Sequence, residues 1–273
     1  MTSTVGNIRL ISVDLDNTLL TDRGQLMLRS ADALMRAAEC GVQVVIATTR
    51  GFEFGRVASR LLGLRTPLIT SNGAEIAATA HGPMWACHTI PAHIALEIAT
   101  LADAHEWEFS IGGGTVTRYL AGPDQAAGML TPSRTLVANS ADAVTDQVSR
   151  MFTHDEAAAN KLRPLCETRF AAHCRTETYY KVDGCFHSFG VFPKLADKGT
   201  ALRLVLERLG ISAENALAIG DNFNDVPMFK VAGTSVAMGN AVDAVKQQAT
   251  HVAPPFSEDG VAWAVEHLVL GER

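Results

Sequence analysis

The sequence lacks the features that mark several classes of protein. In its 273 residues no window approaches the roughly 18 consecutive apolar residues of a membrane span. The stretch Met1–Ile8 has neither the basic nor the apolar region of a secretory signal peptide, so we expect a cytoplasmic protein with no membrane partner. An excess of positive charge is also missing. The formal net charge is −6, and because phosphate backbones demand a basic face, we expect no nucleic-acid partner.

Paired cysteine motifs are absent as well. The five cysteines are odd in number and contain no Cys-x-x-Cys pair, which is consistent with a reducing compartment. One group of side chains has the ligand types of a zinc site, although its spacing fits none of the usual paired motifs. The alternative is that its cysteines are packed in a core, where free cysteines are common, and we favour it. The group consists of Cys166, His173, Cys174, Cys185 and His187.

Both ends of the chain have the alternating strand and helix pattern of an α/β protein. Hydrophobic residues make up 47% of the chain, enough for a sizeable core. Strands alternating with helices predict a parallel sheet covered on both faces, a Rossmann-like core. The expected strands are Ile8–Leu15, Val42–Ala47, Pro67–Thr70, Ala216–Ile219 and Ser235–Met238. The expected helices run from a Ser30 cap to Gly41, over Phe52–Leu62, over Lys198–Leu209, from Val242 and over Asp259–Leu270.

The middle of the chain has a different pattern. Residues 77–188 combine a plausible helix, Pro91–Ala104, with β-type segments at Thr115–Leu120 and Thr178–Val182. We interpret Gly112–Gly114 as a hairpin loop, because no helix clearly begins behind it to make a phosphate cradle. The sequence therefore predicts a core of residues 1–76 and 189–273, with an α+β domain inserted at 77–188.

The most informative feature is a pair of carboxylates behind the first predicted strand. The run Ile11-Ser-Val-Asp14-Leu-Asp16-Asn-Thr18 brings apolar residues directly to two acids two positions apart. Ligands bind beyond the carboxyl ends of strands in open parallel sheets. Two acids at that place can bind a divalent cation and divide nucleophilic and proton-transfer roles between them.

Three further polar segments follow predicted strands or begin a helix. If the strands end at the same edge of the sheet, these segments meet Asp14 and Asp16 in one crevice. Crowded carboxylates raise one another's pKa unless a cation neutralises them, and hard oxygen ligands suit Mg²⁺. A hydroxyl, an ammonium and helix N-terminal amides suit a phosphoryl group. The three segments are Thr48-Thr49-Arg50, the helix start at Lys198, and Gly220-Asp221-Asn222-Phe223-Asn224-Asp225.

This order of motifs resembles the haloacid dehalogenase (HAD) superfamily. The C-terminal segments and one turn more specifically resemble its Cof-type, subfamily IIB sugar-phosphatase branch. The inserted region fits the α/β cap of that branch in position and size. Asn17 and Thr49 stand where the family often has glycine, which affects loop geometry but removes no chemical group. The segments that carry the closer resemblance are Ser71-Asn-Gly-Ala, Lys198-Gly-Thr-Ala-Leu, Leu209-Gly-Ile, Val236-Ala-Met-Gly-Asn-Ala and Glu258-Asp-Gly-Val-Ala.

The resemblance implies a role for each matching residue. Asp14 would be the nucleophile that forms an aspartyl-phosphate, and Asp16 the general acid and then the general base. Asp225 would support Lys198 or the metal shell. The implied phosphate- or substrate-binding residues are Thr48, Thr49, Asn72, Lys198 and Asn224. The implied Mg²⁺ ligands are Asp14, Asp16 through its carbonyl, Asp221 and Asp225.

The expected activity is a Mg²⁺-dependent phosphatase acting on small phosphate esters, either sugar phosphates or a phosphorylated cofactor. A cap of this size is expected to exclude water and large substrates. Two alternatives stay open. One is a phosphomutase of the phosphomannomutase kind, in which Arg118, Arg175 and Lys181 of the insertion would grip a second phosphate. The other is a binding module for a phosphorylated metabolite that has lost turnover. The sequence does not indicate an oligomeric state.

Overall fold

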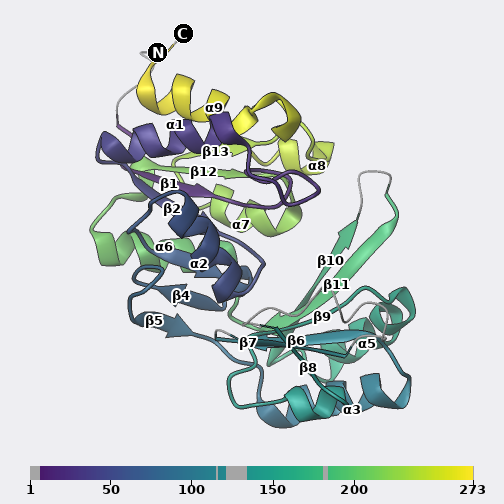
Figure 1. Ribbon diagram of the computed structural model, residues 1–273. Coiled ribbons are helices and arrows are strands. Elements are labelled where there is room, and N and C mark those ends of the chain that lie inside the picture. Colours follow the sequence, from purple (N-terminus) through teal and green to yellow (C-terminus); the bar gives the residue numbers. More distant parts are fainter. Residues whose placement is uncertain (1–6, 115, 121–133, 181–183, 273) are drawn as a thin grey trace. The chain divides into compact units, whose positions relative to one another are not determined.

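The computed structural model describes residues 7–114, 116–120, 134–180 and 184–272. The chain forms two compact units. Unit 1 consists of the chain up to Thr49, Gly55–Trp85 and the chain from Asp197 onward, whereas unit 2 consists of Arg50–Phe54 and Ala86–Ala196. Each unit has its own sheet (Figure 1). The fold is therefore α/β, as predicted.

Unit 1 is built on an eight-stranded sheet in the order β14-β13-β12-β1-β2-β3-β4-β5. The strands from β14 to β3 are parallel, and β4 pairs antiparallel with β3. All five strands predicted for this sheet are present, and the sequence pattern missed β4 and the two edge strands β5 and β14. The strands are β1 (Leu10–Val13), β2 (Gln43–Ala47), β3 (Leu68–Thr70), β4 (Glu75–Ala77), β5 (Met84–Cys87), β12 (Ala216–Gly220), β13 (Thr234–Ala237) and β14 (His251–Val252).

The centre of this sheet is apolar because helices cover both of its faces. Every residue of β1 and of β12 is buried, which is why these strands appear as continuous apolar runs. In Figure 1, α1 and α9 lie together on one face, and α6 and α7 lie on the other. The helices of unit 1 are α1 (Leu28–Glu39), α2 (Phe52–Leu61, which begins in unit 2), α6 (Lys198–Leu209), α7 (Val226–Phe229), α8 (Asp243–Lys246) and α9 (Gly260–Val265).

Two helix boundaries differ from the sequence prediction. Ser30 does not cap α1, because the helix already begins at Leu28 and the Ser30 hydroxyl donates to Asp259 Oδ1 at 3.3 Å. The predicted C-terminal helix, Asp259–Leu270, is divided into α9 and a π-helical turn, Glu266–Leu270, and a 3-10 turn, Phe256–Glu258, precedes it. By contrast, α6 has the predicted bounds and ends at Gly210.

Unit 2 contains a six-stranded sheet in the order β10-β11-β9-β6-β7-β8, mostly antiparallel. Its core lies between one face of this sheet and two helices. Gly112 and Gly113 end β6 and lie in the β6–β7 hairpin, as predicted. The elements are α3 (Ala92–Ala104), α5 (Glu156–Thr168), β6 (Phe109–Gly113), β7 (Val116–Leu120), β8 (Arg134–Leu136), β9 (Arg150–Thr153), β10 (Cys174–Tyr180) and β11 (Phe186–Pro193).

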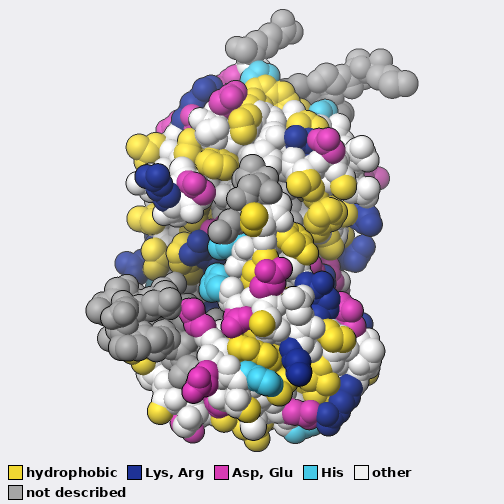
Figure 2. Space-filling model, turned by 90° about the vertical axis from the view of Figure 1, so that its right-hand side faces the viewer, with side chains coloured by type: hydrophobic (Ala, Val, Ile, Leu, Met, Phe, Trp, Pro, Cys, Tyr) yellow, Lys and Arg dark blue, Asp and Glu magenta, His cyan; other side chains and the backbone are white. Residues whose placement is uncertain are grey.

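The compact units overlap with the expected domains but have other boundaries. Residues 77–85 belong to unit 1, because β4 and the first half of β5 extend its sheet. Residues 189–196 belong to unit 2, because β11 pairs with β10 and β9. Within the described ranges, no helix is long and apolar enough to cross a membrane. Acidic and basic side chains are interspersed on the face drawn in Figure 2.

Candidate active site

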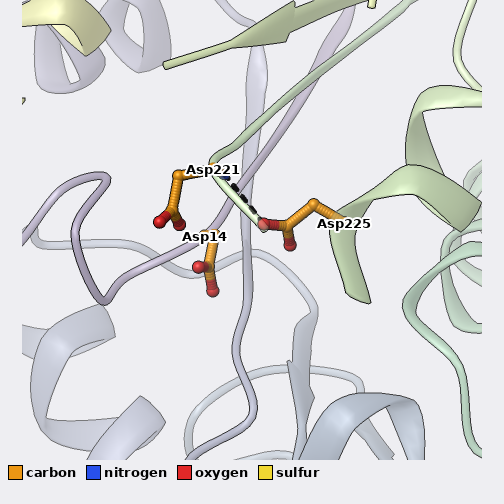
Figure 3. A group of neighbouring side chains, drawn as sticks. All are labelled: Asp14, Asp221 and Asp225. Atoms are coloured by element: carbon orange, nitrogen blue, oxygen red, sulfur yellow. Dashed lines mark hydrogen bonds between the residues drawn. The ribbon is translucent and has the colours of Figure 1, made fainter. Parts of the chain in front are cut away.

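The candidate site begins where β1 and β12, two neighbouring strands inside the sheet of unit 1, end. Asp14 follows β1 and Asp221 follows β12, and the two strands are parallel neighbours in register. The Asp14 backbone N–H donates to Ile219 O at 3.0 Å, which continues the ladder to the strand ends. Their carboxylates consequently lie beside each other, as Figure 3 shows. Asp14 and Asp221, from two of the four segments expected to converge, therefore lie at the same edge of the sheet.

Three carboxylates crowd this position. One oxygen from each of Asp14, Asp221 and Asp225 lies within 4.8 Å of the others. Burial raises the pKa of Asp14 to about 7, with the charges of Asp225 and Asp16 adding to the effect and Lys198 opposing it. Withdrawal from water and the charges of Asp14 and Asp225 likewise raise the pKa of Asp221 well above its usual value. Without a cation, this cluster therefore holds its negative charge at a high energetic cost.

Lys198 is the cation that the chain itself supplies. Its side chain is fully buried at the first position of α6, and its Nζ donates to Asp14 Oδ1 at 2.7 Å and to Asp225 Oδ1 at 2.6 Å. Burial lowers the pKa of Lys198, but the two carboxylates outweigh burial and raise the pKa above its usual value. The ammonium therefore stays charged, although a helix N-terminus by itself disfavours a cation.

Asp225 supports the loop that carries Asp221. Its Oδ2 accepts the backbone N–H groups of Asp221 at 2.9 Å and Asn222 at 3.0 Å, while its Oδ1 accepts from Lys198. A Cβ at Gly220 would come within 2.4 Å of this carboxylate, so the close approach requires glycine there. Both carboxylate oxygens of Asp225 thus have protein donors, which makes it a support for Lys198 and for the loop.

A group of amides and hydroxyls lies in unit 1 around the turn behind β3. Asn224 Nδ2 donates to Thr49 Oγ1 at 2.9 Å and to Asn72 Oδ1 at 3.4 Å. Asn72 Nδ2 and Asn224 Oδ1 are buried, and neither has a hydrogen-bond partner among the described residues. Thr48 is fully buried, and its carbonyl accepts the Asn72 backbone N–H at 3.1 Å. One amide donor and one amide acceptor are thereby left for a ligand.

The remaining predicted residue, Asp16, lies two positions beyond Asp14 and is partly buried. Its charge raises the pKa of Asp14, so the two carboxylates interact. The next residue, Asn17, adopts a φ of 55°, a left-handed conformation that asparagine tolerates better than most residues. This backbone explains why asparagine can stand at a position where the family often has glycine.

Three residues of this region were not assigned roles from the sequence. The Thr18 hydroxyl donates to Asp221 Oδ1 at 3.1 Å, and its place in the Asp-x-Asp-x-Thr motif was the available signal. Asp197 caps α6 by accepting the Thr200 N–H at 2.8 Å, and an Asp before a helical pattern is a standard N-cap signal. Glu75 is fully buried behind the Asn72 turn, and nothing in its local sequence predicts that.

The alternative residues of the insertion are placed differently. Arg175 donates to Ala196 O at 2.8 Å and pairs with Glu177. The Arg118 side chain and Lys181 lie outside the described residues. Among the residues that are described, the acidic cluster is the one group of three or more potential metal-binding side chains, and the residues considered for zinc are not in it. Cys166 and Cys174 are buried in the core of unit 2.

The structure is that of an α/β protein with crowded carboxylates at the ends of two neighbouring parallel strands and a buried lysine in contact with two of them. The model of the haloacid dehalogenase-like hydrolase family matches residues 11–265 of the chain. The chain belongs to this family and is an enzyme of the hydrolase class.

Curated relatives and solved structures agree with this assignment. Pyridoxal phosphate phosphatase YbhA of Escherichia coli (strain K12) is 31% identical over 277 residues, covering 96% of this chain and 99% of the relative. 5-amino-6-(5-phospho-D-ribitylamino)uracil phosphatase YcsE of Bacillus subtilis (strain 168) is 31% identical over 267 residues, covering 97% of each. A haloacid dehalogenase-like hydrolase from B. subtilis has a TM-score of 0.81 at 24% identity, covering 96% of this chain and 100% of that chain. The HAD subclass IIB sugar phosphatase BT4131 has a TM-score of 0.77 at 21% identity, covering 95% and 98%, and both structures support the fold.

Proposed function

We propose that this chain is a Mg²⁺-dependent phosphatase that hydrolyses small phosphorylated metabolites through an aspartyl-phosphate on Asp14. The observation that carries the proposal is the buried contact of Lys198 with Asp14 and Asp225 beside Asp221. This arrangement places a potential nucleophile next to a fixed positive charge. Phosphoryl transfer is mostly positioning and charge neutralisation, and both are provided here.

The acidic cluster fits a divalent cation. Its oxygen donors are hard ligands, its pKa values are raised, and the ammonium of Lys198 offsets only part of the crowded negative charge. Asp14 and Asp221 would hold the ion, with Asp16 contributing through its carbonyl. Asp225 has protein donors on both oxygens and would act from behind them. When bound, Mg²⁺ supplies charge neutralisation to the phosphoryl oxygens.

The chain's own residues would carry out the reaction in two steps. In the first, an Asp14 oxygen attacks phosphorus, the ester P–O bond breaks, and Asp16 donates a proton to the departing oxygen. In the second, Asp16 takes a proton from water as that water attacks the aspartyl-phosphate, which releases phosphate and restores Asp14. The residues that would hold the phosphoryl oxygens are Thr48, Thr49, Asn72, Lys198 and Asn224.

The names of the relatives guide the substrate proposal. YbhA is named for pyridoxal phosphate, and YcsE for a phosphorylated ribitylaminouracil. BT4131 is described as a sugar phosphatase. We propose the same broad class for this chain, namely sugar phosphates or a phosphorylated cofactor in the cytoplasm. Unit 2 would be the cap that selects among them, and the chain outside it the catalytic core.

Phosphate release from a panel of small esters, with Mg²⁺ and with EDTA, tests the proposal. We expect release with Mg²⁺ only, and Asp14→Asn to lower kcat by at least about 10³-fold, because the nucleophile is lost. Asp22→Asn is the matched control, because it makes the same change at an exposed aspartate. Full activity in Asp14→Asn would refute the mechanism. Isomerisation of a hexose phosphate without phosphate release would favour the phosphomutase. Binding of a phosphorylated ligand without turnover would favour the binding module.

A further inference from the structure

The turn between β3 and β4 has an unusual backbone. Ser71, Asn72 and Gly73 all have positive φ values, of 51°, 57° and 92°. Consecutive left-handed residues that are not glycine are strained, and they persist only where the surroundings hold them. Such strain commonly accompanies a functional position.

The turn lies among predicted phosphate-binding residues. The Asn72 N–H donates to Thr48 O, and the Asn72 side chain accepts from Asn224. A Cβ at Gly73 would come within 2.3 Å of Asp197 O, so the turn packs directly against the start of the helix that carries Lys198. The turn is therefore in contact with the Thr48 carbonyl, the Asn224 amide and the beginning of α6.

A buried carboxylate holds this turn from behind. Glu75 is fully buried at the start of β4, directly opposite Thr70 in the β3–β4 pairing. Its Oε2 accepts the Ser71 hydroxyl at 2.7 Å and the Thr70 hydroxyl at 3.2 Å. One oxygen of Glu75 thus holds both Thr70 and Ser71, the two residues that precede Asn72.

The Asn72 amide has the features of a prepared ligand contact. It is 1% exposed, and its Nδ2 has no hydrogen-bond partner among the described residues. A buried amide donor without a partner is costly, which is acceptable where a ligand oxygen completes it.

We propose that Glu75 is a positioning residue that holds the Ser71–Gly73 turn so that Asn72 Nδ2 can donate to a phosphate oxygen of the substrate. This inference rests on the proposed phosphatase function. It adds a residue that does not itself contact substrate, because Glu75 acts through Ser71 and the backbone of Asn72.

The test compares two variants of similar side-chain length. Glu75→Gln keeps a side-chain oxygen that can accept the Ser71 and Thr70 hydroxyls, whereas Glu75→Met removes the acceptor. We measure the Kd of inorganic phosphate by titration calorimetry with Mg²⁺ present, together with KM and kcat. We expect Glu75→Met to weaken phosphate binding and raise KM about tenfold, the loss of roughly one charge-assisted hydrogen bond. Glu75→Gln, which keeps an accepting oxygen, should lose less phosphate affinity than Glu75→Met.

Two further variants separate positioning from stability. In an Asn72→Ala background, Glu75→Met should weaken phosphate binding no further, because the contact that it positions is already gone. Ser30→Ala, which loses a buried hydroxyl beneath α9, is the control for general destabilisation and should leave the phosphate Kd unchanged. If Glu75→Met misfolds, Ser71→Ala tests the same contact more mildly and should also raise the phosphate Kd.

The outcomes for Glu75 and for the proposed function are distinguishable. A wild type that releases phosphate, with unchanged phosphate Kd and KM in Glu75→Met and Ser71→Ala, overturns the positioning role alone. Additive losses of phosphate binding in the double variant also overturn it. A wild type that binds phosphate but hydrolyses no ester overturns the phosphatase function, while the binding measurements still decide the role of Glu75.

Discussion

At the scale of single residues, Asp14 combines two opposing requirements. A nucleophile must be ionised, yet the buried position of Asp14 favours its protonated form. Lys198 opposes that effect through a 2.7 Å hydrogen bond, and it is itself held by Asp225. The two contacts explain why a lysine is fully buried here: it is paired on both sides with carboxylates.

The raised pKa of Asp14 predicts a pH-dependent stability in the absence of metal. A carboxyl whose pKa rises from 3.8 unfolded to about 7 folded destabilises the fold as pH increases across that window. Asp14→Asn cannot ionise, so in EDTA its melting temperature should exceed that of the wild type by roughly 5 °C at pH 8 and by much less at pH 5. Differential scanning calorimetry at several pH values measures this.

The control for that prediction is Asp22→Asn, which makes the same substitution at an exposed aspartate outside the acidic cluster. Mg²⁺ should raise the melting temperature of the wild type at pH 8 and have little effect on Asp14→Asn, since a bound cation relieves the same crowding. If the melting temperatures of Asp14→Asn and the wild type differ by the same amount from pH 5 to 8, ionised Asp14 is not the cause of the destabilisation.

At the scale of elements, α6 shows how a helix start is adapted to a site. Its interior follows from the sequence, because Leu202, Val205 and Leu206 form one buried face. Its first turn does not follow from propensity, since a cation is disfavoured there. Asp197 compensates by capping the helix, and its negative charge precedes Lys198 directly.

Loss of this cap should therefore affect both stability and catalysis. We expect Asp197→Ala to lower the free energy of unfolding by about 1 kcal/mol and to reduce kcat/KM, because the helix turn that positions Lys198 frays. Asp197→Ser keeps a capping oxygen and should recover most of both losses. Urea denaturation and steady-state kinetics on the two variants test this. Equal losses in the two variants would show that capping is not the cause.

Which elements the sequence could predict depends on where their determinants lie. The strand β1 and the helix α6 were predictable because local apolar patterns and a terminal Gly210 define them. Ser30 was assigned wrongly as a cap because its partner, Asp259, is more than 200 residues away in the chain. β4 was missed because it is only three residues long, and pairing with β3 rather than its own pattern defines it. For the site, strand-end position placed Asp14 and Asp221 correctly, whereas the support from Glu75 depends on a tertiary contact.

At the scale of the whole molecule, unit 1 is discontinuous in sequence. Its sheet joins β1 to β12, so the candidate site combines Asp14 with Lys198 and Asp221 from the other end of the chain. Unit 2 also includes Arg50–Phe54, a segment that no local pattern assigns to the insertion, because only packing decides its membership. The family resemblance, by contrast, could be read from the sequence because its motifs are local and ordered.

The cysteines provide a test that covers both units. Burial raises the pKa of Cys166 to about 12 and that of Cys174 to about 11, so both thiols stay protonated and unreactive in the native state. Cys40, Cys87 and Cys185 are exposed. Native alkylation followed by peptide mass spectrometry should label these three and spare the two buried cysteines, whereas labelling in urea should reach all five. Rapid native modification of Cys166 would contradict the packed core of unit 2.

The position of β1 between β2 and β12 has a consequence for synthesis on the ribosome. β1 and β2 emerge early and can pair, but the other edge of β1 has no neighbour until Ala216–Gly220 has been translated. An open apolar strand edge invites pairing with other chains, and long-range parallel pairing forms slowly. During this interval the nascent chain therefore presents an unpaired strand edge that a chaperone can shield, and the acidic site cannot assemble until Asp225 has left the exit tunnel.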